Sequence, residues 1–171
     1  MADYLPLDGE RRWELENDEH GALLRVELQP GPSDGPRHLH HFDPDTLRKV
    51  LDLELASTPA YGIEVHGWRV GTGSEVRLDP PMELTPGRMA QDDVHDASVD
   101  DFEVYVRFAG LEVCENGWVG DAWECAVLDI EAPGTPLDGH FELAPVYGFS
   151  VWQRSDDPAP WRLRRAFYET D

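Results

Sequence analysis

The chain has 171 residues, 40 % of them hydrophobic, and 35 acidic residues against 14 basic ones give it a formal net charge of −21. The length suits one β-rich domain, residues 1–171. So negative a surface repels phosphate backbones and anionic lipid. The charge therefore argues against nucleic acid and membranes as partners and favours a basic protein. Apolar runs fall short of the roughly 18 residues that cross a bilayer and the N-terminus lacks a leader pattern, so a soluble, cytoplasmic protein is expected.

The first predicted element is a β-hairpin over residues 13–29. Trp13 and Leu15 alternate with glutamates, and a second alternating run follows the turn "DEHG". The next segment, "PGPSDGP" at residues 30–36, holds three prolines and two glycines, which cannot continue a strand ladder. It predicts a loop.

The segment "FDPDTLRKVLDLELA" predicts the one helix of the chain, over residues 44–56. Asp43 suits the N-cap, and Pro44 suits the first helical position. Four apolar residues would share one face of this helix: Leu47, Val50, Leu51 and Leu55. The helix is expected to pack against one side of a sheet.

From about residue 60 onward the apolar period becomes two, which is typical of strands. The glycine turn "GTGS" joins two predicted strands, "YGIEVHGWRV" and "EVRLD". Residues 80–101 predict a surface loop. Further on, the alternation of apolar residues shifts phase at Gly110, which predicts a β-bulge. The whole pattern gives about nine short strands. The predicted fold is mainly β (a β-rich α+β fold): an antiparallel meander curved into a half-barrel or barrel, with the helix near 44–56 beside it.

Four stretches resemble β-rich domains of bacterial lipoproteins of unassigned role: "YLPLDGERRWEL", "LDPPMELTPG", "GLEVCENGWVGDAWECAVLDIE" and "APVYGFSVWQRS". The shared layout is a Tyr-x-Pro-Leu…Trp opening, a proline-rich centre, a Gly…Cys-x-Val strand and a glycine-containing closing strand. This chain has Tyr-Gly-Phe where the closing strand would carry a second glycine, and it lacks the lipoprotein leader. The resemblance implies an antiparallel half-barrel and supplies no catalytic residues.

The two cysteines, Cys114 and Cys125, flank "ENGWVGDAWE". They could face each other across a hairpin at a separation that allows a disulfide. A cytosolic setting would keep them reduced, and reduced thiols are the prediction.

Three histidines stand together in "HLHH", residues 38–41. In an extended segment His38 and His40 point the same way with Cα atoms about 7 Å apart, close enough to share zinc or another divalent metal. A third ligand could come from Asp43, His66 or His95. Because the spacing of helical zinc-enzyme motifs is missing, the segment is interpreted first as a polar loop, and no cofactor is assigned.

Two kinds of binding residue stand out. Five aspartates in "DDVHDASVDD" could dock against Arg and Lys of a partner: Asp92, Asp93, Asp96, Asp100 and Asp101. Their spacing is not that of an EF-hand loop. Trp118 and Trp152 are the best candidates for exposed aromatic side chains that anchor a partner.

No nucleophile elbow, phosphate-binding loop or dinucleotide fingerprint is present in the sequence. The leading hypothesis is a non-enzymatic acidic protein that works by protein–protein contact, as an immunity protein, inhibitor or accessory factor. One alternative is a carrier of a small apolar ligand inside the half-barrel. Another is a metal-dependent enzyme that uses His38 and His40.

Overall fold

Alternation of apolar and polar residues builds twelve antiparallel strands, which form one sheet. The computed structural model describes the following residues: 4–5, 7, 9–29, 35–43, 45–60, 62–114, 123–145 and 147–169. The strands have these bounds: β1 (Glu10–Asn17), β2 (Leu23–Gln29), β3 (Arg37–Phe42), β4 (Lys49–Ser57), β5 (Ile63–Val70), β6 (Val76–Thr85), β7 (Val94–Asp96), β8 (Tyr105–Val113), β9 (Glu124–Glu131), β10 (Gly139–Ala144), β11 (Gly148–Arg154) and β12 (Trp161–Glu169). The prediction of a mainly β, antiparallel fold is confirmed.

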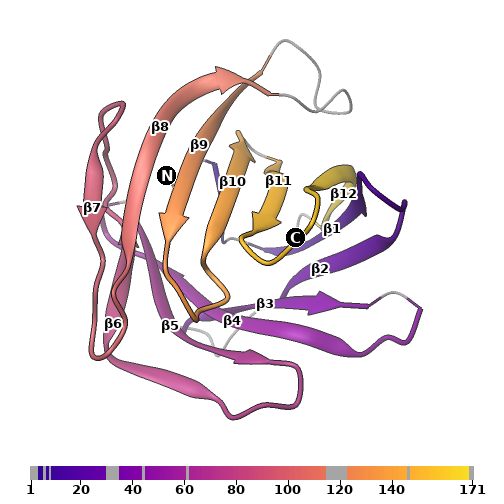
Figure 1. The fold of residues 1–171 in the computed structure, drawn as a ribbon, viewed down its shortest axis with the longest axis horizontal. Coiled ribbons are helices and arrows are strands. Elements are labelled where there is room, and N and C mark those ends of the chain that lie inside the picture. Colours follow the sequence, from indigo (N-terminus) through magenta and orange to yellow (C-terminus); the bar gives the residue numbers. More distant parts are fainter. Residues whose placement is uncertain are drawn as a thin grey trace.

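The sheet is a meander that curls into a nearly closed barrel (Figure 1). Strands that are consecutive in the sequence are hydrogen-bonded to each other everywhere except at β6 and β7, and β1 also pairs with β12. The twelve strands therefore form a ring with a single seam. No helix in the described residues is long and apolar enough to cross a membrane.

A side chain bridges the seam between β6 and β7. His95 of β7 places Nε2 at 2.8 Å from the carbonyl oxygen of Glu83 in β6, so this ring nitrogen carries the proton and donates it. Pro80 and Pro81 in β6 have no N–H to offer to another strand. The two prolines therefore limit strand pairing along the edge of β6. The contact between His95 and Glu83 joins β6 to β7 where the two strands do not pair.

Inward side chains fill the ring with one continuous hydrophobic core. Its largest fully buried members are Trp13, Leu15, Leu28, Leu39, Leu51, Leu53, Ile63 and Met82. Removing this apolar surface from water is the main source of stability. Because alternate residues of a strand point to opposite faces, the polar residues between the core positions gather on the outer wall.

The predicted helix over residues 44–56 is wrong, although its capping chemistry is real. The Asp43 side chain accepts hydrogen bonds from the N–H groups of Asp45 (2.9 Å) and Thr46 (3.1 Å), as an N-cap does. The turn then ends at Leu47, whose φ of 54° is left-handed and cannot continue an α-helix. Asp43 therefore caps a turn that reverses the chain from β3 into β4.

The residues beyond this turn follow the period of a strand. Leu51, Leu53 and Leu55 are all at most 3 % exposed and point into the core. Asp52 and Glu54 lie between them and face outward. The same leucines are also compatible with one face of a helix. Burial of every second residue in the sheet outweighs that helical preference.

The prediction of about nine strands is also wrong, because three strands were missed: β4 in the predicted helix, and β3 and β7 in predicted loops. The "HLHH" segment is strand β3 and not a loop. In the predicted loop over residues 80–101, β6 continues to Thr85 and β7 occupies residues 94–96. The hairpin over residues 13–29 is confirmed as β1 and β2. Residues 30–34 of the predicted loop at 30–36 lie outside the described residues.

The predicted bulge at Gly110 is confirmed. The pairing of β8 with β9 shifts between Phe108 and Gly110, and Gly110 has a φ of 135°. That backbone conformation is rare for residues with a side chain, so glycine suits the position.

The cysteines are bonded, contrary to the prediction of reduced thiols. Cys114 and Cys125 form a disulfide with Cα atoms 5.0 Å apart, and neither cysteine is free. Cys114 also donates its backbone N–H to the carbonyl oxygen of Trp123 at 3.1 Å, as neighbours across a hairpin do. The alternative of a disulfide across the hairpin is therefore the one that the structure has, with Cys114 just after β8 and Cys125 near the start of β9.

Candidate functional site

Outward side chains pair into a polar row that crosses the outer wall from β1 to β5. Arg12 in β1 stands opposite Glu27 in β2, and Glu27 stands opposite His40 in β3. His40 stands opposite Asp52 in β4, which in turn faces Arg69 in β5. Cross-strand pairs of opposite charge stabilise such a face, and His40, at 8 % exposure, is sheltered within it.

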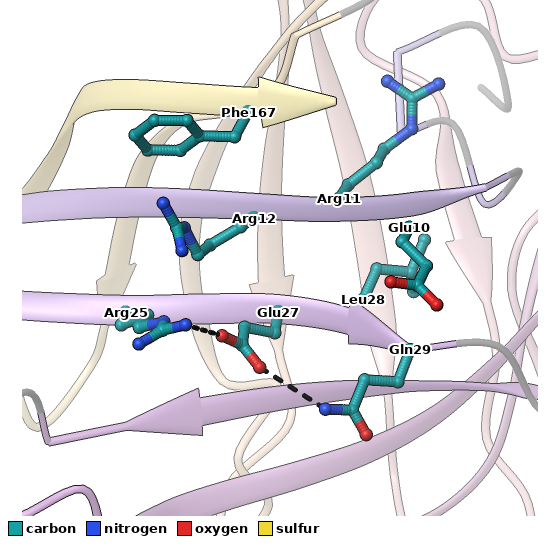
Figure 2. Close-up of a pocket in the computed structure, with 8 residues that line it drawn as sticks. All are labelled: Glu10, Arg11, Arg12, Arg25, Glu27, Leu28, Gln29 and Phe167. Atoms are coloured by element: carbon teal, nitrogen blue, oxygen red, sulfur yellow. Dashed lines mark hydrogen bonds and ion pairs between the residues drawn. The ribbon is translucent and has the colours of Figure 1, made fainter. Parts of the chain in front are cut away.

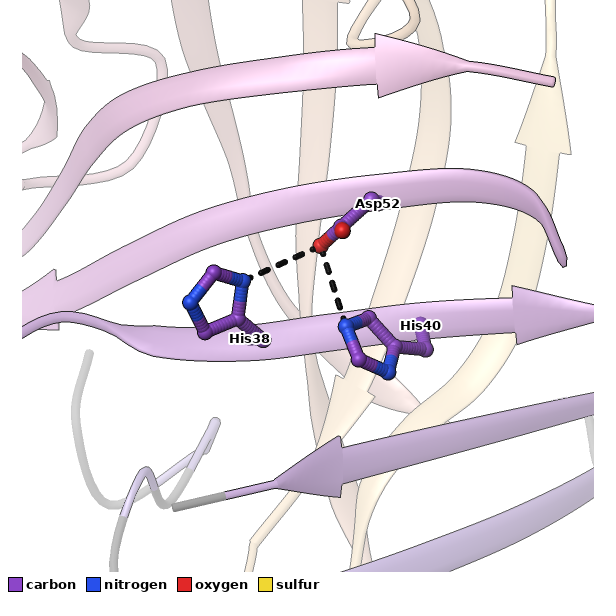
Figure 3. Close-up of side chains that lie close together, drawn as sticks. All are labelled: His38, His40 and Asp52. Atoms are coloured by element: carbon purple, nitrogen blue, oxygen red, sulfur yellow. Dashed lines mark hydrogen bonds and ion pairs between the residues drawn. The ribbon is translucent and has the colours of Figure 1, made fainter. Parts of the chain in front are cut away.

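Two histidines and one aspartate converge at the middle of this row (Figure 3). His38 and His40 are two residues apart on β3 and therefore project from the same face. Asp52 Oδ1, from the neighbouring β4, lies 3.3 Å from His38 Nδ1 and 3.2 Å from His40 Nε2. One ligand atom from each residue lies within 4.8 Å of the other two, and the described part of the chain has no second such group of His, Cys, Asp and Glu.

Lys49 joins this group because β4 contains a bulge. In a regular strand, residues three apart point to opposite faces, so Lys49 would turn inward while Asp52 faces outward. The pairing of β3 with β4 shifts by one residue at Val50, and Phe42 is thereby paired with Lys49. The extra residue returns the lysine to the outer face.

The Lys49 ammonium determines where the protons lie. Its Nζ is 2.9 Å from His40 Nε2 and 3.1 Å from Asp52 Oδ2. An ammonium can only donate, so His40 Nε2 presents its lone pair to Lys49. That lone pair also lies 3.2 Å from Asp52 Oδ1, so two electron-rich atoms are held close together by a shared cation.

Burial lowers the pKa of His40; the Asp52 charge opposes this shift and the Lys49 charge adds to it. For Asp52 burial acts in the opposite sense, but the Lys49 hydrogen bond and the nearby histidines outweigh it and lower the pKa of the carboxyl. The pair therefore favours a neutral imidazole beside an ionised carboxylate. These are the forms in which both groups bind metal ions.

A pocket of about 190 Å³ opens beside the three residues, and His38 and Asp52 form part of its lining. Glu75 also lines this pocket and accepts hydrogen bonds from both Arg69 and Arg77. Solvent and small solutes can thus approach His38 and Asp52 from the outer wall.

A second hollow of about 400 Å³ lies between β12, β1 and β2 (Figure 2). The guanidinium carbon of Arg12 is 4.1 Å from the ring centroid of Phe167, a cation–π contact. Arg25 pairs with Glu27, which also accepts a hydrogen bond from Gln29 at 3.4 Å. Arg12 thus contacts an aromatic ring and Arg25 a carboxylate, while the Nε atom of each is buried without a hydrogen-bond acceptor.

A third polar cluster lies on the opposite wall, around His140 of β10. Its Nδ1 is 2.8 Å from Asp129, and its Nε2 is 3.9 Å from Glu142. Glu142 and then Asp129 raise the pKa of His140 to about 9, against the effect of burial. His140 is therefore a cation at neutral pH and neutralises two acidic neighbours.

Replacement of His140 by glutamine should lower stability at acidic and neutral pH but not at high pH. The folded-state pKa of about 9 lies above the ordinary 6.5, so the stabilisation is complete below pH 6.5 and is lost as the pH rises through 9. Discounted for partial solvent exposure, the expected cost near pH 6 is roughly 1–2 kcal/mol. Urea unfolding near pH 6 and near pH 10 measures it, with His20→Gln in an exposed turn as the control. A cost that persists unchanged at high pH would contradict this assignment.

Of the two tryptophans proposed as exposed anchors, the structure describes only Trp152. Trp152 is 3 % exposed, so the prediction of exposure is wrong. Its ring packs against His41, Phe141 and Phe149, with ring centroids 4.4, 4.9 and 4.9 Å away. Trp118 lies outside the described residues.

The five aspartates of the acidic segment are all exposed, beside and within β7. Asp92 pairs with Arg107 at 2.8 Å, and Asp96 accepts the N–H of Ser98 at 3.0 Å. Asp93 accepts the N–H of Ala90 at 2.6 Å. Asp100 and Asp101 continue the segment beyond β7. These carboxylates shape turns and remain open to solvent.

The third member of the histidine site is Asp52, which the sequence did not suggest. Of the ligands considered, Asp43 caps the turn before β4, His66 lies 3.5 Å from Glu64, and His95 bridges the seam. The alternation of Asp52 with buried leucines was the available signal. Because residues 44–56 were predicted to be a helix, this alternation was not used.

Comparison with protein-family models, with curated proteins and with solved structures finds no match. The resemblance to lipoprotein domains therefore stays a prediction. The described chain is a nearly closed, twelve-stranded antiparallel β meander with a His–His–Asp group on its outer wall.

Proposed function

We propose that this protein binds a divalent transition-metal ion, of which zinc is the representative, through His38, His40 and Asp52. The observation that carries the proposal is the spacing of the three ligand atoms. Ligands roughly 2.0–2.1 Å from a tetrahedral zinc ion lie about 3.3 Å from one another. Asp52 Oδ1 is 3.3 Å from one imidazole nitrogen and 3.2 Å from the other, and the ligand atoms of the three residues all lie within 4.8 Å of one another.

The chemistry of the group supports the same proposal. Two imidazoles and one carboxylate are a ligand set used for zinc and for non-haem iron. The ligands stand on adjacent paired strands, so little rearrangement is needed to bring them onto one ion. The neighbouring pocket leaves room for water to complete the coordination. A metal-dependent enzyme, the alternative suggested by His38 and His40, would use those same open positions.

The test is calorimetric titration of tag-free protein with zinc chloride, together with elemental analysis of the purified protein. The expected result is one zinc ion per chain with a dissociation constant in the micromolar range or tighter. A titration without saturable heat, from protein that also carries less than about 0.1 equivalent of metal, would refute the proposal.

A second candidate function is contact with a basic protein, and the exposed acidic segment favours it. Its five aspartates are open to solvent on a chain of net charge −21. Charge complementarity of this kind speeds association and selects the partner, and it is screened by salt. The partner class is an immunity target, an inhibited enzyme or another basic protein.

Replacement of the five aspartates by asparagine should weaken binding to an immobilised oligo-arginine peptide at low salt by about tenfold or more. Asparagine keeps an acceptor oxygen for the turn hydrogen bonds, so the fold should persist. The matched control removes five exposed carboxylates elsewhere: Glu10, Glu19, Asp45, Glu131 and Asp156. Equal losses in both variants, or binding unchanged at about 0.5 M salt, would remove the segment as a docking site.

The carrier alternative requires an apolar cavity inside the barrel. The inward side chains instead pack into one continuous buried cluster. The hollows described above, at His38 and at Arg12, lie on the outer wall. The described structure therefore gives the carrier hypothesis no support.

A further inference from the structure

Lys49 is the only lysine in the chain, against thirteen arginines. It reaches the outer wall only because of the bulge at Val50. The one primary side-chain amine of the protein therefore lies at the histidine site, and every other Lys or Arg position is arginine.

The ammonium lies where a metal ion would share ligands. Its Nζ contacts His40 Nε2 at 2.9 Å and Asp52 Oδ2 at 3.1 Å, and both residues belong to the proposed ligand set. A metal ion needs the same His40 lone pair that the ammonium occupies. The two cations therefore exclude each other at His40.

We infer that Lys49 is a tethered cation that competes with the metal ion for His40 and Asp52, so that the charge of this lysine sets the metal affinity. The inference rests on the proposed function. In the metal-free form the ammonium satisfies the carboxylate and the imidazole lone pair. In the metal-bound form it is displaced toward solvent, which its side chain, already 37 % exposed, can reach. Acylation of the amine would remove the competitor and tighten metal binding.

The first test measures zinc affinity by competition with a chromophoric chelator, using tag-free protein. Lys49→Met keeps the length of the side chain and removes its charge, and it should bind zinc about tenfold more tightly than wild type. Lys49→Arg keeps a positive donor and should stay within a factor of about three of wild type. Arg48→Met removes a neighbouring charge without touching the site, and it controls for the change in net charge.

The second test uses the fact that the chain has one lysine. Acetylation of Lys49 by a water-soluble acetylating reagent, followed by peptide mass spectrometry, should proceed several-fold faster in saturating zinc, because the displaced amine leaves its partners. The N-terminal amine provides the internal control for reagent strength. Protection of Lys49 by zinc would contradict displacement.

The outcomes separate the two proposals. If wild type binds zinc and Lys49→Met binds it no more tightly, the competition is refuted while the metal site stands. If Lys49→Met binds zinc and wild type binds it far more weakly, the competition is supported. If neither protein binds zinc, the proposed function itself is refuted, and the inference with it.

Discussion

Replacement of Asp52 by asparagine should lower zinc affinity at least about 100-fold, and His38→Gln and His40→Gln should each have a similar effect. Asp52 supplies the oxygen that lies within 3.3 Å of both imidazoles, so its loss removes a ligand and the only carboxylate of the group. Asparagine has nearly the same shape as aspartate, and the side chain is 18 % exposed, so the fold should tolerate the change. Calorimetric titration with zinc gives the affinity directly.

His66→Gln is the matched control for the ligand variants. His66 is another partly exposed histidine on the same sheet, in β5, and it pairs with Glu64 and not with the three proposed ligands. Its replacement should leave zinc affinity within a factor of about two, since His66 contributes no atom to the group formed by His38, His40 and Asp52. Equal losses in His66→Gln and His40→Gln would show that zinc binds to scattered surface histidines, and the site would then have to be abandoned.

Reduction of the disulfide should lower the free energy of unfolding by about 3 kcal/mol. Cys114 and Cys125 are 11 residues apart, and closing a loop of that size restricts the unfolded chain by roughly this amount in the chain-entropy model. The measurement is urea unfolding of the oxidised protein, the reduced protein and the Cys114→Ser, Cys125→Ser double variant. The reduced protein and the double variant should agree with each other.

The same experiment tests whether the bond forms in solution. Thiol titration of the unfolded, unreduced protein should find essentially no free thiol, because both cysteines of the chain are paired. Two titratable thiols in protein purified under oxidising conditions, with no change in stability on adding reductant, would restore the original prediction of reduced cysteines.

Local sequence patterns predicted the parts of the fold whose signal lies within one hairpin. The hairpin over residues 13–29 and the bulge at Gly110 depend on alternation and on a glycine, both of which are readable from neighbouring residues. The helix prediction after Asp43 was wrong because the segment carries both a helix-capping signal and the alternation of a strand. The Asp43 side chain caps a turn, and alternating leucines then form a strand. Only the packing of β4 between β3 and β5 decides between them.

The candidate site was half predictable for the same reason. His38 and His40 are two residues apart, so any extended conformation places them on one face. Asp52 meets them through the pairing of β3 with β4, and Lys49 does so through a register shift at Val50. Register and bulges depend on the whole sheet, and one sequence gives no direct measure of them. The burial of Trp152 was missed for a related reason, since it depends on the neighbouring strand β10 and on inward residues such as His41.

The most direct test of the account is an anomalous diffraction experiment at the zinc absorption edge on crystals of tag-free protein equilibrated with zinc. We expect one strong anomalous peak at roughly 2.0–2.2 Å from a ring nitrogen of His38, from His40 Nε2 and from an Asp52 oxygen. In that crystal the Lys49 side chain should have left His40. Zinc-saturated crystals with no anomalous peak among these three side chains would contradict the account.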